Sequence, residues 1–338
     1  MKVEASDFGV VNGDKVTLYT LSNSQGMQAK ILNYGGIIHE LNVLDNQGKL
    51  HACVQSYSTI EGYVDDPSYR NAIVGRFANR IGHGKFTLEG AEYHLDKNGG
   101  EHNLHGGIPG FHKKMWKAKA ETHADSVSLS LSLSSPDGEG GFPGNVDVEA
   151  VYILDDANTL SLSLNATTDK ATPFSLTQHA YFTLSKDATV ENTLVQIDAE
   201  QVTDADSTLL PTGKLIEVAG TPFDFSALTR VNENSAKSHD LYNLVGGYDH
   251  NFVLNKAVAG KPQAQVFAED TNLQMDLYTD LPGIQFYTGS LETDSQLGAL
   301  CLEPQHFPDA PNKPEFPDCI IYPDKPFTAE IRYQFKLR

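Results

Sequence analysis

The sequence predicts an all-β fold, a large antiparallel sandwich of many strands with few short helices. Three observations support this prediction. Apolar residues alternate with polar ones in several segments, turn residues separate these segments, and no long stretch repeats with the 3.6-residue period of a helix. Many strands with frequent turns and few helices are typical of an antiparallel sandwich.

The clearest predicted strands are residues 126–133 and 159–164, which read S-V-S-L-S-L-S-L and T-L-S-L-S-L. Alternation with a period of two places the apolar side chains on one face of a half-buried strand. Weaker examples of this pattern predict further strands at 15–21, 28–32, 36–43, 146–154, 194–197, 251–254, 273–279, 283–288 and 327–335. We expect one short helix, over residues 235–243.

Turn residues separate the strands, as in D-N-Q-G at 45–48 and D-D-A-N at 155–158. The longest irregular stretch is the glycine-rich loop at 134–144. It contains no lysine and precedes no predicted helix, so it is not expected to bind phosphate. Because we find neither a low-complexity linker nor a convincing repeat, we predict a single domain over residues 1–338.

Composition narrows the classes of partner. The chain has 338 residues and a formal net charge of -19. Such an acidic chain repels phosphate backbones and anionic lipids, so we expect a neutral small-molecule substrate, without nucleic acid or membrane partners. Cys53, Cys301 and Cys319 are too few and too widely spaced for a disulfide framework, which favours the cytoplasm. No segment has the pattern of a signal peptide or a membrane-spanning helix.

One carboxylate stands at the end of a predicted buried strand. Glu303 lies in C-L-E-P-Q-H-F-P-D-A-P, between the apolar residues Leu297, Ala299, Leu300 and Leu302 and three prolines. Apolar surroundings disfavour the charged form and raise the pKa of a carboxylate towards neutrality, where it can transfer protons. On this stretch alone, a strand-end glutamate that faces water is an equal alternative.

Several polar residues lie where predicted strands meet loops, and each also has a structural interpretation. His102 and His105 lie in G-G-E-H-N-L-H-G-G, whose glycines let the backbone approach a ligand. His179 lies in the apolar segment S-L-T-Q-H-A-Y-F-T-L, where a hydrogen-bonded structural histidine is the commoner case. Asn79 and Arg80 lie in V-G-R-F-A-N-R-I-G, and such an arginine either pairs with a carboxylate or holds hydroxyl groups.

Two spacings suggest metal ligands, His102-x-x-His105 and Glu303-x-x-His306. At these spacings the side chains share a face only on a helix. Glycines flank the first pair and Pro304 interrupts the second, so neither segment is expected to be helical. We therefore predict no metal site.

Eight segments in one order make the chain resemble the aldose 1-epimerases, also called galactose mutarotases. They are V-G-R-F-A-N-R-I at 74–81, N-L-H-G-G at 103–107, G-F-H-K-K-M-W at 110–116, G-F-P-G-N-V at 141–146, Q-H-A-Y-F-T-L at 178–184, Y-D-H-N-F at 248–252, P-G-I-Q-F-Y-T-G at 282–289 and C-L-E-P-Q-H-F-P-D-A-P-N at 301–312. The resemblance spans nearly the whole chain. It implies a β-supersandwich and the interconversion of the α and β anomers of free aldohexoses such as galactose and glucose.

The resemblance also implies a role for individual residues. Glu303 matches the catalytic base, His179 matches the general acid, and His105 matches a second histidine that helps to hold the sugar and its reacting oxygens. The residues that match the sugar-binding set are Arg80, Asp249 and Gln285, with Asn79 beside them. The family commonly has N-H-x-Y-F-N-L around its acid, whereas this chain has Gln178 and Thr183 at the two asparagine positions. These replacements leave the acid in place and bear on sugar preference.

Anomer interconversion requires opening and reclosing the sugar ring. A carboxylate and an imidazole suit the proton transfers at neutral pH, and the chemistry requires no cofactor. Phe286 or Trp116 could cover the apolar face of the sugar, or could pack in the core. The resemblance thus leads us to expect a monomer or homodimer with an aldose as its small-molecule partner.

Three other functions remain open at this stage. A glycoside hydrolase could use Glu303 and Asp249 as its carboxylate pair, although the histidine motifs favour it less. A non-catalytic sugar-binding module would need neither an acid nor a base. An epimerase of sugar phosphates would need a cationic cluster, which the net charge of -19 does not favour.

Overall fold

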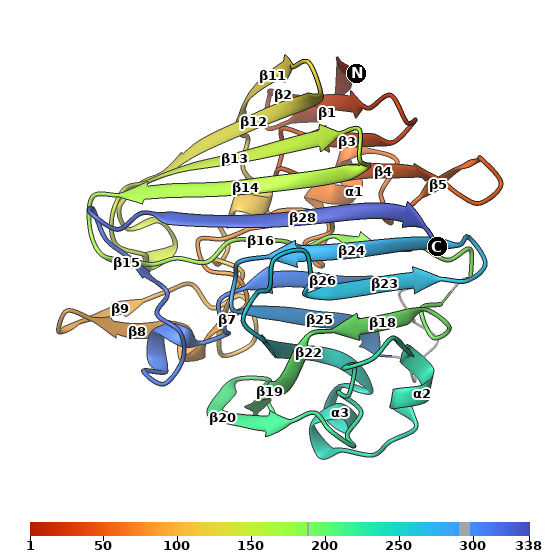
Figure 1. Cartoon of the computed structure of the whole chain (residues 1–338). Helices are drawn as coiled ribbons and strands as arrows, with labels where there is room; N and C mark the ends of the chain where they lie inside the picture. Colours follow the sequence, from red (N-terminus) through yellow and green to blue (C-terminus); the bar gives the residue numbers. More distant parts are fainter. Residues whose placement is uncertain (188, 291–297) are drawn as a thin grey trace.

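The computed structural model of the protein describes residues 1–187, 189–290 and 298–338, and strands dominate it (Figure 1). The α-helices of the described residues are short: α1 (Ile60–Val64), α2 (Val231–Ser235) and α3 (Asp240–Val245). None of them is long and apolar enough to cross a membrane. Single 3-10 turns lie at Gly82–Gly84, Phe111–Lys113, Glu139–Gly141 and Ala310–Asn312. The all-β prediction is confirmed.

The largest sheet has nine antiparallel strands and extends across the molecule (Figure 1). In spatial order its strands are β11 (Lys117–Thr122), β12 (Ser126–Ser135), β13 (Val146–Asp155), β14 (Thr159–Thr168), β28 (Phe327–Leu337), β24 (Leu273–Thr279), β23 (Ala264–Ala268), β18 (Leu194–Ile197) and β21 (Thr229–Arg230). The two segments with the clearest alternation form β12 and β14, and every leucine in them is buried. Their apolar faces therefore contribute to the core.

Two further sheets contribute to the sandwich. The six-stranded sheet has the order β17 (Tyr181–Phe182), β26 (Leu300–Gln305), β25 (Gly283–Ser290), β22 (Gly247–Leu254), β19 (Ala199–Ala205) and β20 (Pro211–Glu217). The N-terminal sheet has the order β1 (Lys2–Val11), β2 (Asp14–Ser22), β3 (Gln28–Leu32), β4 (Ile38–Leu44) and β5 (Leu50–Ala52). Buried apolar side chains from all three sheets, such as Ile31, Leu162 and Phe286, belong to one cluster. Removing this apolar surface from water is the main force that holds the sheets together.

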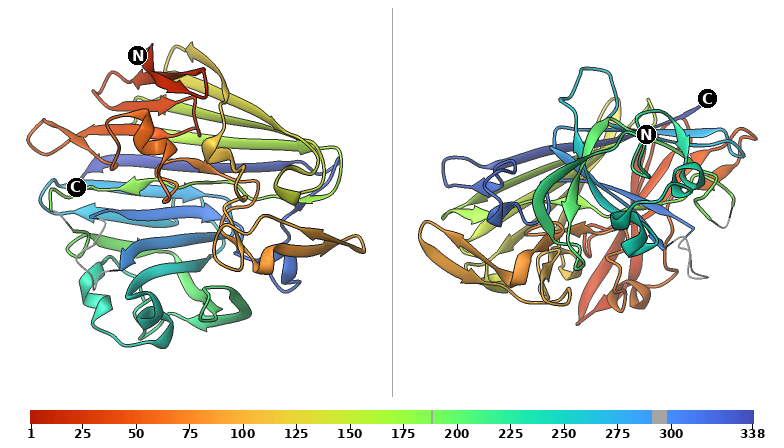
Figure 2. Two further views of the ribbon diagram at one scale, coloured as in Figure 1. Left: turned by 180° about the vertical axis from the view of Figure 1, so that it is seen from behind. Right: turned by 90° about the horizontal axis from the view of Figure 1, so that it is seen from below.

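Four short ladders complete the fold. They pair β6 (Ile73–Val74) with β16 (Thr177–Gln178), β7 (Arg80–Ile81) with β10 (Asn103–Leu104), β8 (Lys85–Leu88) with β9 (Ala91–His94), and β15 (Thr172–Pro173) with β27 (Ile320–Ile321). The β8–β9 hairpin projects from the corner of the molecule opposite the N-terminal strands (Figure 2). The β6–β16 and β7–β10 ladders place the histidine and arginine motifs of the sequence next to each other.

Each predicted strand overlaps a strand of the structure, and the differences lie at the strand ends. Residues 28–32, 194–197 and 273–279 coincide with β3, β18 and β24. The strand predicted from residue 36 begins at Ile38, because Gly35 and Gly36 adopt positive φ angles of 65° and 58°. Sequence analysis missed β1, which is largely exposed and therefore lacks a clear apolar face. It also missed β11, β19, β20 and β23.

The helix predicted over residues 235–243 is confirmed in its second half, but its bounds are wrong. Helix α2 ends at Ser235 and α3 begins at Asp240. His239 separates them because its backbone is extended, with a φ of -155°, and its Nδ1 atom accepts a hydrogen bond from the Leu241 N–H at 3.2 Å. A side chain that satisfies a free N–H in the first turn defines a helix start.

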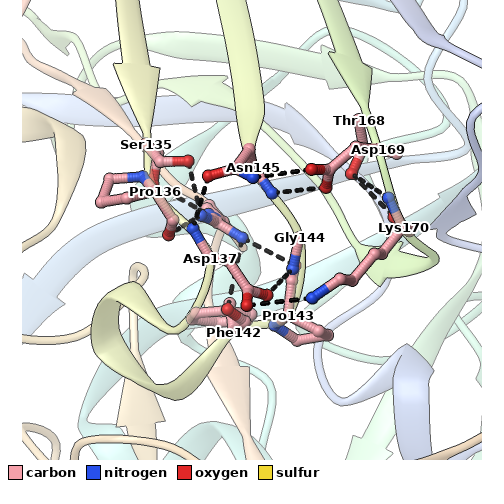
Figure 3. A network of polar contacts seen from close by, with 11 residues as sticks. Ser135, Pro136, Asp137, Phe142, Pro143, Gly144, Asn145, Thr168, Asp169 and Lys170 are labelled. Atoms are coloured by element: carbon pink, nitrogen blue, oxygen red, sulfur yellow. Dashed lines mark hydrogen bonds and ion pairs between the residues drawn. The ribbon is translucent and has the colours of Figure 1, made fainter.

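The glycine-rich loop between β12 and β13 is held by polar contacts (Figure 3). The Asn145 side chain donates to Asp169 at 2.6 Å, and Asp137 accepts from the Gly144 N–H at 2.6 Å. The buried guanidinium of Arg76 donates to the backbone carbonyls of Ser135 at 2.9 Å and Pro136 at 2.7 Å. These contacts give the loop a structural role and join it to Arg76.

Candidate active site

One cavity of about 240 Å³ contains six of the seven predicted site residues in its wall. These residues are Asn79, Arg80, His105, His179, Asp249 and Glu303. They come from segments far apart in the sequence. The six-stranded sheet and the β6–β16 and β7–β10 ladders bring these segments together. Two larger hollows, of about 400 and 460 Å³, are lined by no histidine among the described residues.

Glu303 lies on β26 and lines the cavity. Its register partner on β25 is Gln285. Two residues earlier in β26, Cys301 pairs with Tyr181 of β17. Glu303 is 2 % exposed, so the interpretation of a water-facing strand end is wrong. Burial, and secondly the charge of Asp249, raise the pKa of the Glu303 carboxyl well above its usual value.

The apolar residues that motivated this assignment behave as expected where they are described. Ala299, Leu300 and Leu302 are buried, and Leu297 lies outside the described residues. The carboxylate therefore has apolar neighbours in its own strand. Its Oε2 atom has no hydrogen-bond partner within the described part of the chain, and it lies 3.5 Å from Nε2 of His179.

His179 follows the short strand β16, and its backbone is fixed on both sides. Its N–H donates to the Ala72 carbonyl at 2.9 Å, and its carbonyl accepts from the Asn71 N–H at 3.0 Å. The imidazole stacks on Tyr181 with ring centroids 5.2 Å apart and an angle of 15° between the planes. Burial lowers the pKa of His179 to about 4, so the free imidazole is neutral at neutral pH.

His105 directly follows β10 and has a positive φ of 51°. Its Nδ1 atom accepts a hydrogen bond from the Asn79 N–H at 3.1 Å. The ring hydrogen must therefore be on Nε2, because a neutral imidazole carries only one. Burial, and secondly the neighbouring His179, lower the pKa of His105 well below its usual value. His105 is thus a neutral hydrogen-bond donor.

The backbone next to His105 leaves no room for a side chain. A Cβ atom on Gly106 would lie 2.0 Å from the Gly75 carbonyl oxygen, and the φ of Gly106 is 87°. Only glycine fits such a close approach with a positive φ. This contact sets the segment around His105 directly against the strand-to-loop segment that leads to Asn79 and Arg80.

Arg80 and Asp249 also line the cavity, where they contact each other. Nη2 of Arg80 lies 3.7 Å from Oδ2 of Asp249, and Oδ1 of Asn79 accepts from the Arg80 backbone N–H at 2.9 Å. Gln285 is the seventh predicted residue and is not among the residues that line the cavity. Its Nε2 atom donates to Oδ1 of Asp249 at 2.6 Å. Gln285 thus contacts Asp249, on the side of the cavity wall away from the solvent.

The cavity also has a donor set that could suit a metal ion. Ligand atoms of His105, His179 and Glu303 all lie within 4.8 Å of one another. Sequence spacing could not reveal this set, because its members come from three segments. Two imidazoles and one carboxylate are known ligands of transition metals. However, Nε2 of His105 carries the ring hydrogen, as the contact with Asn79 requires, so it has no lone pair for a metal. The absence of a metal stays a prediction.

Tyrosines, rather than the two aromatic residues considered from sequence, line the cavity. Trp116 and Phe286 are 2 % and 0 % exposed and belong to the apolar core, so a sugar cannot reach them. Tyr69, Tyr181 and Tyr287 line the cavity instead. Tyr287 follows Gln285 by two positions in β25, a spacing that places both side chains on one face of the strand. Tyr181 follows His179 by two positions and stacks on its ring. For Tyr69 the sequence contains no comparable signal.

The replaced asparagine positions lie outside the cavity wall. The Gln178 side chain is fully buried, where its Oε1 atom accepts from the Tyr152 hydroxyl at 2.6 Å. The Thr183 hydroxyl donates to the Ser185 carbonyl at 3.3 Å. The side chain of His102 contacts Thr208 at 2.9 Å and also does not line the cavity.

Comparison with known protein families agrees with this arrangement. The family model described as aldose 1-epimerase matches residues 17–334. The galactose mutarotase of Rattus norvegicus is 34% identical over 337 residues, which cover 96% of this chain and 95% of the rat protein. The aldose 1-epimerase of Escherichia coli (strain K12) is 33% identical over 337 residues, which cover 96% of each chain.

Solved structures show the same fold. A galactose 1-epimerase from Lactobacillus acidophilus NCFM superposes with a TM-score of 0.89 at 27% identity, covering 99% of both chains. An aldose epimerase homologue from C. elegans superposes with a TM-score of 0.85 at 28% identity, covering 95% of this chain and 98% of that one. The prediction of a galactose mutarotase-like β-supersandwich is therefore confirmed. Together, the family model, the relatives and the fold show that this chain belongs to the aldose 1-epimerase family of carbohydrate isomerases.

Proposed function

We propose that this protein interconverts the α and β anomers of free aldohexoses such as galactose and glucose. The observation that carries the proposal is the contact between Glu303 and His179. An acid and a base lie 3.5 Å apart, both almost fully buried, at one cavity that also contains Arg80 and Asp249. The family and the names of its members support the same conclusion.

In the proposed mechanism, Glu303 and His179 exchange protons with one sugar. Glu303 takes the proton of the C1 hydroxyl as the bond between C1 and the ring oxygen breaks. His179 gives a proton to that ring oxygen, which yields the open aldehyde. After rotation about C1–C2, the C5 hydroxyl attacks the other face of the carbonyl. His179 then recovers its proton and Glu303 returns one to O1. Every proton is restored, so no cofactor is required.

Burial determines where the shared proton is most stable. The pKa of Glu303 is raised and that of His179 is lowered, so the empty site favours a protonated Glu303 beside a neutral His179. These are the protonation states that follow ring opening. With the cyclic sugar bound, the charged pair is the less stable form. The low-polarity site thus favours the transfer of the proton to Glu303.

The remaining residues hold the sugar in the proposed complex. His105 donates from Nε2 to an oxygen at the reacting end, where it stabilises negative charge. Arg80, Asn79 and Asp249 bind the ring hydroxyls through their donors and acceptors. Gln285 contributes by orienting Asp249. Tyr69, Tyr181 and Tyr287 provide aromatic surface for the C–H groups of the sugar.

Contacts in the cavity also favour this function over the three alternatives. Arg80 is the only arginine or lysine that lines the cavity among the described residues, and it already contacts Asp249. That favours a neutral sugar over a sugar phosphate. A binding module needs no buried acid–base pair. Both oxygens of Asp249 face donors of Gln285 and Arg80, which suits hydroxyl binding better than the role of a glycosidase nucleophile.

We further propose that residues 1–338 act as one domain in the cytoplasm, as a monomer or homodimer. One buried cluster contains side chains from all three larger sheets, which supports a single domain. The three cysteines are free and buried, as suits a reducing compartment.

Replacing Glu303 by Gln should lower turnover by about 10²- to 10⁴-fold, because the amide cannot accept the C1 proton. The same variant should gain thermal stability relative to the wild type as pH rises. The folded-state pKa of Glu303 is raised, so ionisation at high pH favours the unfolded wild-type chain, whereas below the usual pKa of glutamate the difference vanishes. Polarimetry and melting curves at several pH values measure both effects.

The matched control for this variant is Glu139→Gln, which removes a half-buried carboxylate outside the cavity. It should keep the wild-type rate. If Glu303→Gln keeps more than about a tenth of the wild-type rate, Glu303 is not the base.

His179→Asn and Arg80→Ala should affect different kinetic constants. His179 moves a proton in the transition state, so its replacement should lower kcat by about 10²-fold or more with little change in KM. Arg80 holds the sugar in the ground state and the transition state alike, so its replacement should chiefly raise KM. Initial rates of mutarotation over a range of sugar concentrations separate the two. A rise in KM alone for His179→Asn would show that the acid is another group.

A comparison of free sugars with their glycosides tests the proposed function. Fresh α-glucose or α-galactose should mutarotate much faster with the protein than in buffer, as followed by polarimetry. Methyl and nitrophenyl glycosides of the same sugars should stay intact, because they have no proton on the C1 oxygen for Glu303 to take. Release of nitrophenol above the buffer rate, with no acceleration of mutarotation, would replace the epimerase by a glycosidase.

A further inference from the structure

A buried glutamine lies two residues beyond Glu303 on the same strand. Gln305 is 0 % exposed and is not among the residues that line the cavity. Its Nε2 atom donates to Oδ1 of Asn251 at 3.2 Å and to Oε1 of Gln285 at 3.3 Å. One amide group of β26 therefore contacts the adjacent strand β25 and also the strand beyond it, β22.

The backbone opposite Gln305 leaves room for this contact. Gly283 on β25 is the register partner of Gln305. A Cβ atom on Gly283 would lie 2.7 Å from Oδ1 of Asn251 and 3.1 Å from the Phe307 ring. A glycine inside a strand often marks a place where other groups approach closely. Here the space is occupied by the acceptor of the Gln305 amide.

A chain of hydrogen bonds leads from Gln305 to the cavity, and each residue in it donates to the next. Gln305 donates to the carbonyl end of the Gln285 side chain, so the NH₂ end of Gln285 must face Asp249. That NH₂ group donates to Oδ1 of Asp249 at 2.6 Å, which leaves Oδ2 on the side of Arg80, at 3.7 Å. A reversed Gln285 amide would place its carbonyl oxygen against the carboxylate and would remove one of the two acceptors of the Gln305 amide.

We propose that Gln305 is a positioning residue for sugar binding. It fixes the orientation of the Gln285 amide, and through it the Asp249 carboxylate that binds a ring hydroxyl. This inference rests on the proposed function of the cavity. It assigns to β26 two tasks, because the strand supplies the base at Glu303 and orients the sugar-binding carboxylate from Gln305.

A purely stabilising role fits the contacts less well. Oε1 of Gln305 and Nδ2 of Asn251 are buried without a hydrogen-bond partner among the described residues. A buried polar group without a partner costs stability, so this network stabilises the core less than a fully paired one would. Its directional contacts, in contrast, define one orientation of Gln285.

The test compares Gln305→Met with Gln285→Leu and with the double variant. Methionine has a similar length and packs adaptably, but it cannot donate a hydrogen bond. Gln305→Met should raise KM for galactose about tenfold, the effect of losing one oriented hydrogen bond, and should leave kcat within about twofold. In the Gln285→Leu background the same replacement should raise KM no further, because its effect passes through Gln285.

The control is Gln263→Leu, which removes another buried glutamine, outside the cavity, whose Oε1 atom accepts from the Thr279 N–H at 2.9 Å. It should lower the melting temperature and leave KM unchanged. If Gln305→Met does the same, or if its effect on KM adds fully to that of Gln285→Leu, Gln305 is only structural. Should Gln305→Met fail to fold, Gln305→Leu is judged by the same criteria, and failure of both to fold would also assign Gln305 a structural role.

A binding measurement distinguishes failure of this inference from failure of the proposed function. Calorimetric titration with methyl β-galactoside, which cannot mutarotate, should show the same tenfold weakening in Gln305→Met. Wild-type protein that mutarotates and binds normally, beside a Gln305→Met variant with unchanged affinity, overturns only the inference. Wild-type protein that neither mutarotates galactose nor binds the glycoside overturns both.

Discussion

The burial of Glu303 beside His179 is the physical constraint on which the rest of the site depends. A carboxylate in an apolar setting is unstable as an anion, and an imidazole there is unstable as a cation. Burial raises the pKa of Glu303 and lowers that of His179, so in the proposed mechanism the two groups share one proton. In the proposed reaction this pairing lets the same two side chains both give and take protons. The apolar environment is therefore part of the chemistry, and the sandwich must exclude water from it.

The sandwich provides this environment by placing the site where several sheets and ladders meet. Strand β26 lies inside the six-stranded sheet, between β17 and β25, so both of its edges are paired. The β6–β16 and β7–β10 ladders, which lie outside that sheet, position His179 and His105. Arg80 lies in β7, His105 directly follows its partner strand β10, and His179 follows β16. In the proposed mechanism, this arrangement orients the side chains for proton transfer.

Much of the fold could be predicted from the sequence, because burial on one face leaves a pattern with a period of two. That pattern located β12 and β14, where leucines alternate with serines. It failed for β1, which is exposed, and for the segment around His239, where one side-chain hydrogen bond separates two helices. Local backbone contacts of this kind leave no periodic signal.

The site was predictable only in part. The resemblance to a family identified residues one at a time, and six of the seven line one cavity. It could not show that Gln285 lies behind Asp249, because that depends on the register of β25 against β22. Similarly, Tyr69 and the contact from Asn79 to His105 depend on turns with positive φ angles, which join segments far apart in the sequence.

The most direct test of the shared proton is the pH dependence of kcat/KM for α-galactose, from about pH 4 to about pH 9, corrected for the buffer rate at each pH. Activity requires one proton on the pair. We expect kcat/KM to fall at acid pH, where the pair gains a second proton on His179 near its lowered pKa of about 4. It should fall again at higher pH, where Glu303 loses the only proton of the pair at its raised pKa. A rate that rises through the usual pKa of glutamate and then stays constant to alkaline pH would contradict a shared proton and a buried Glu303.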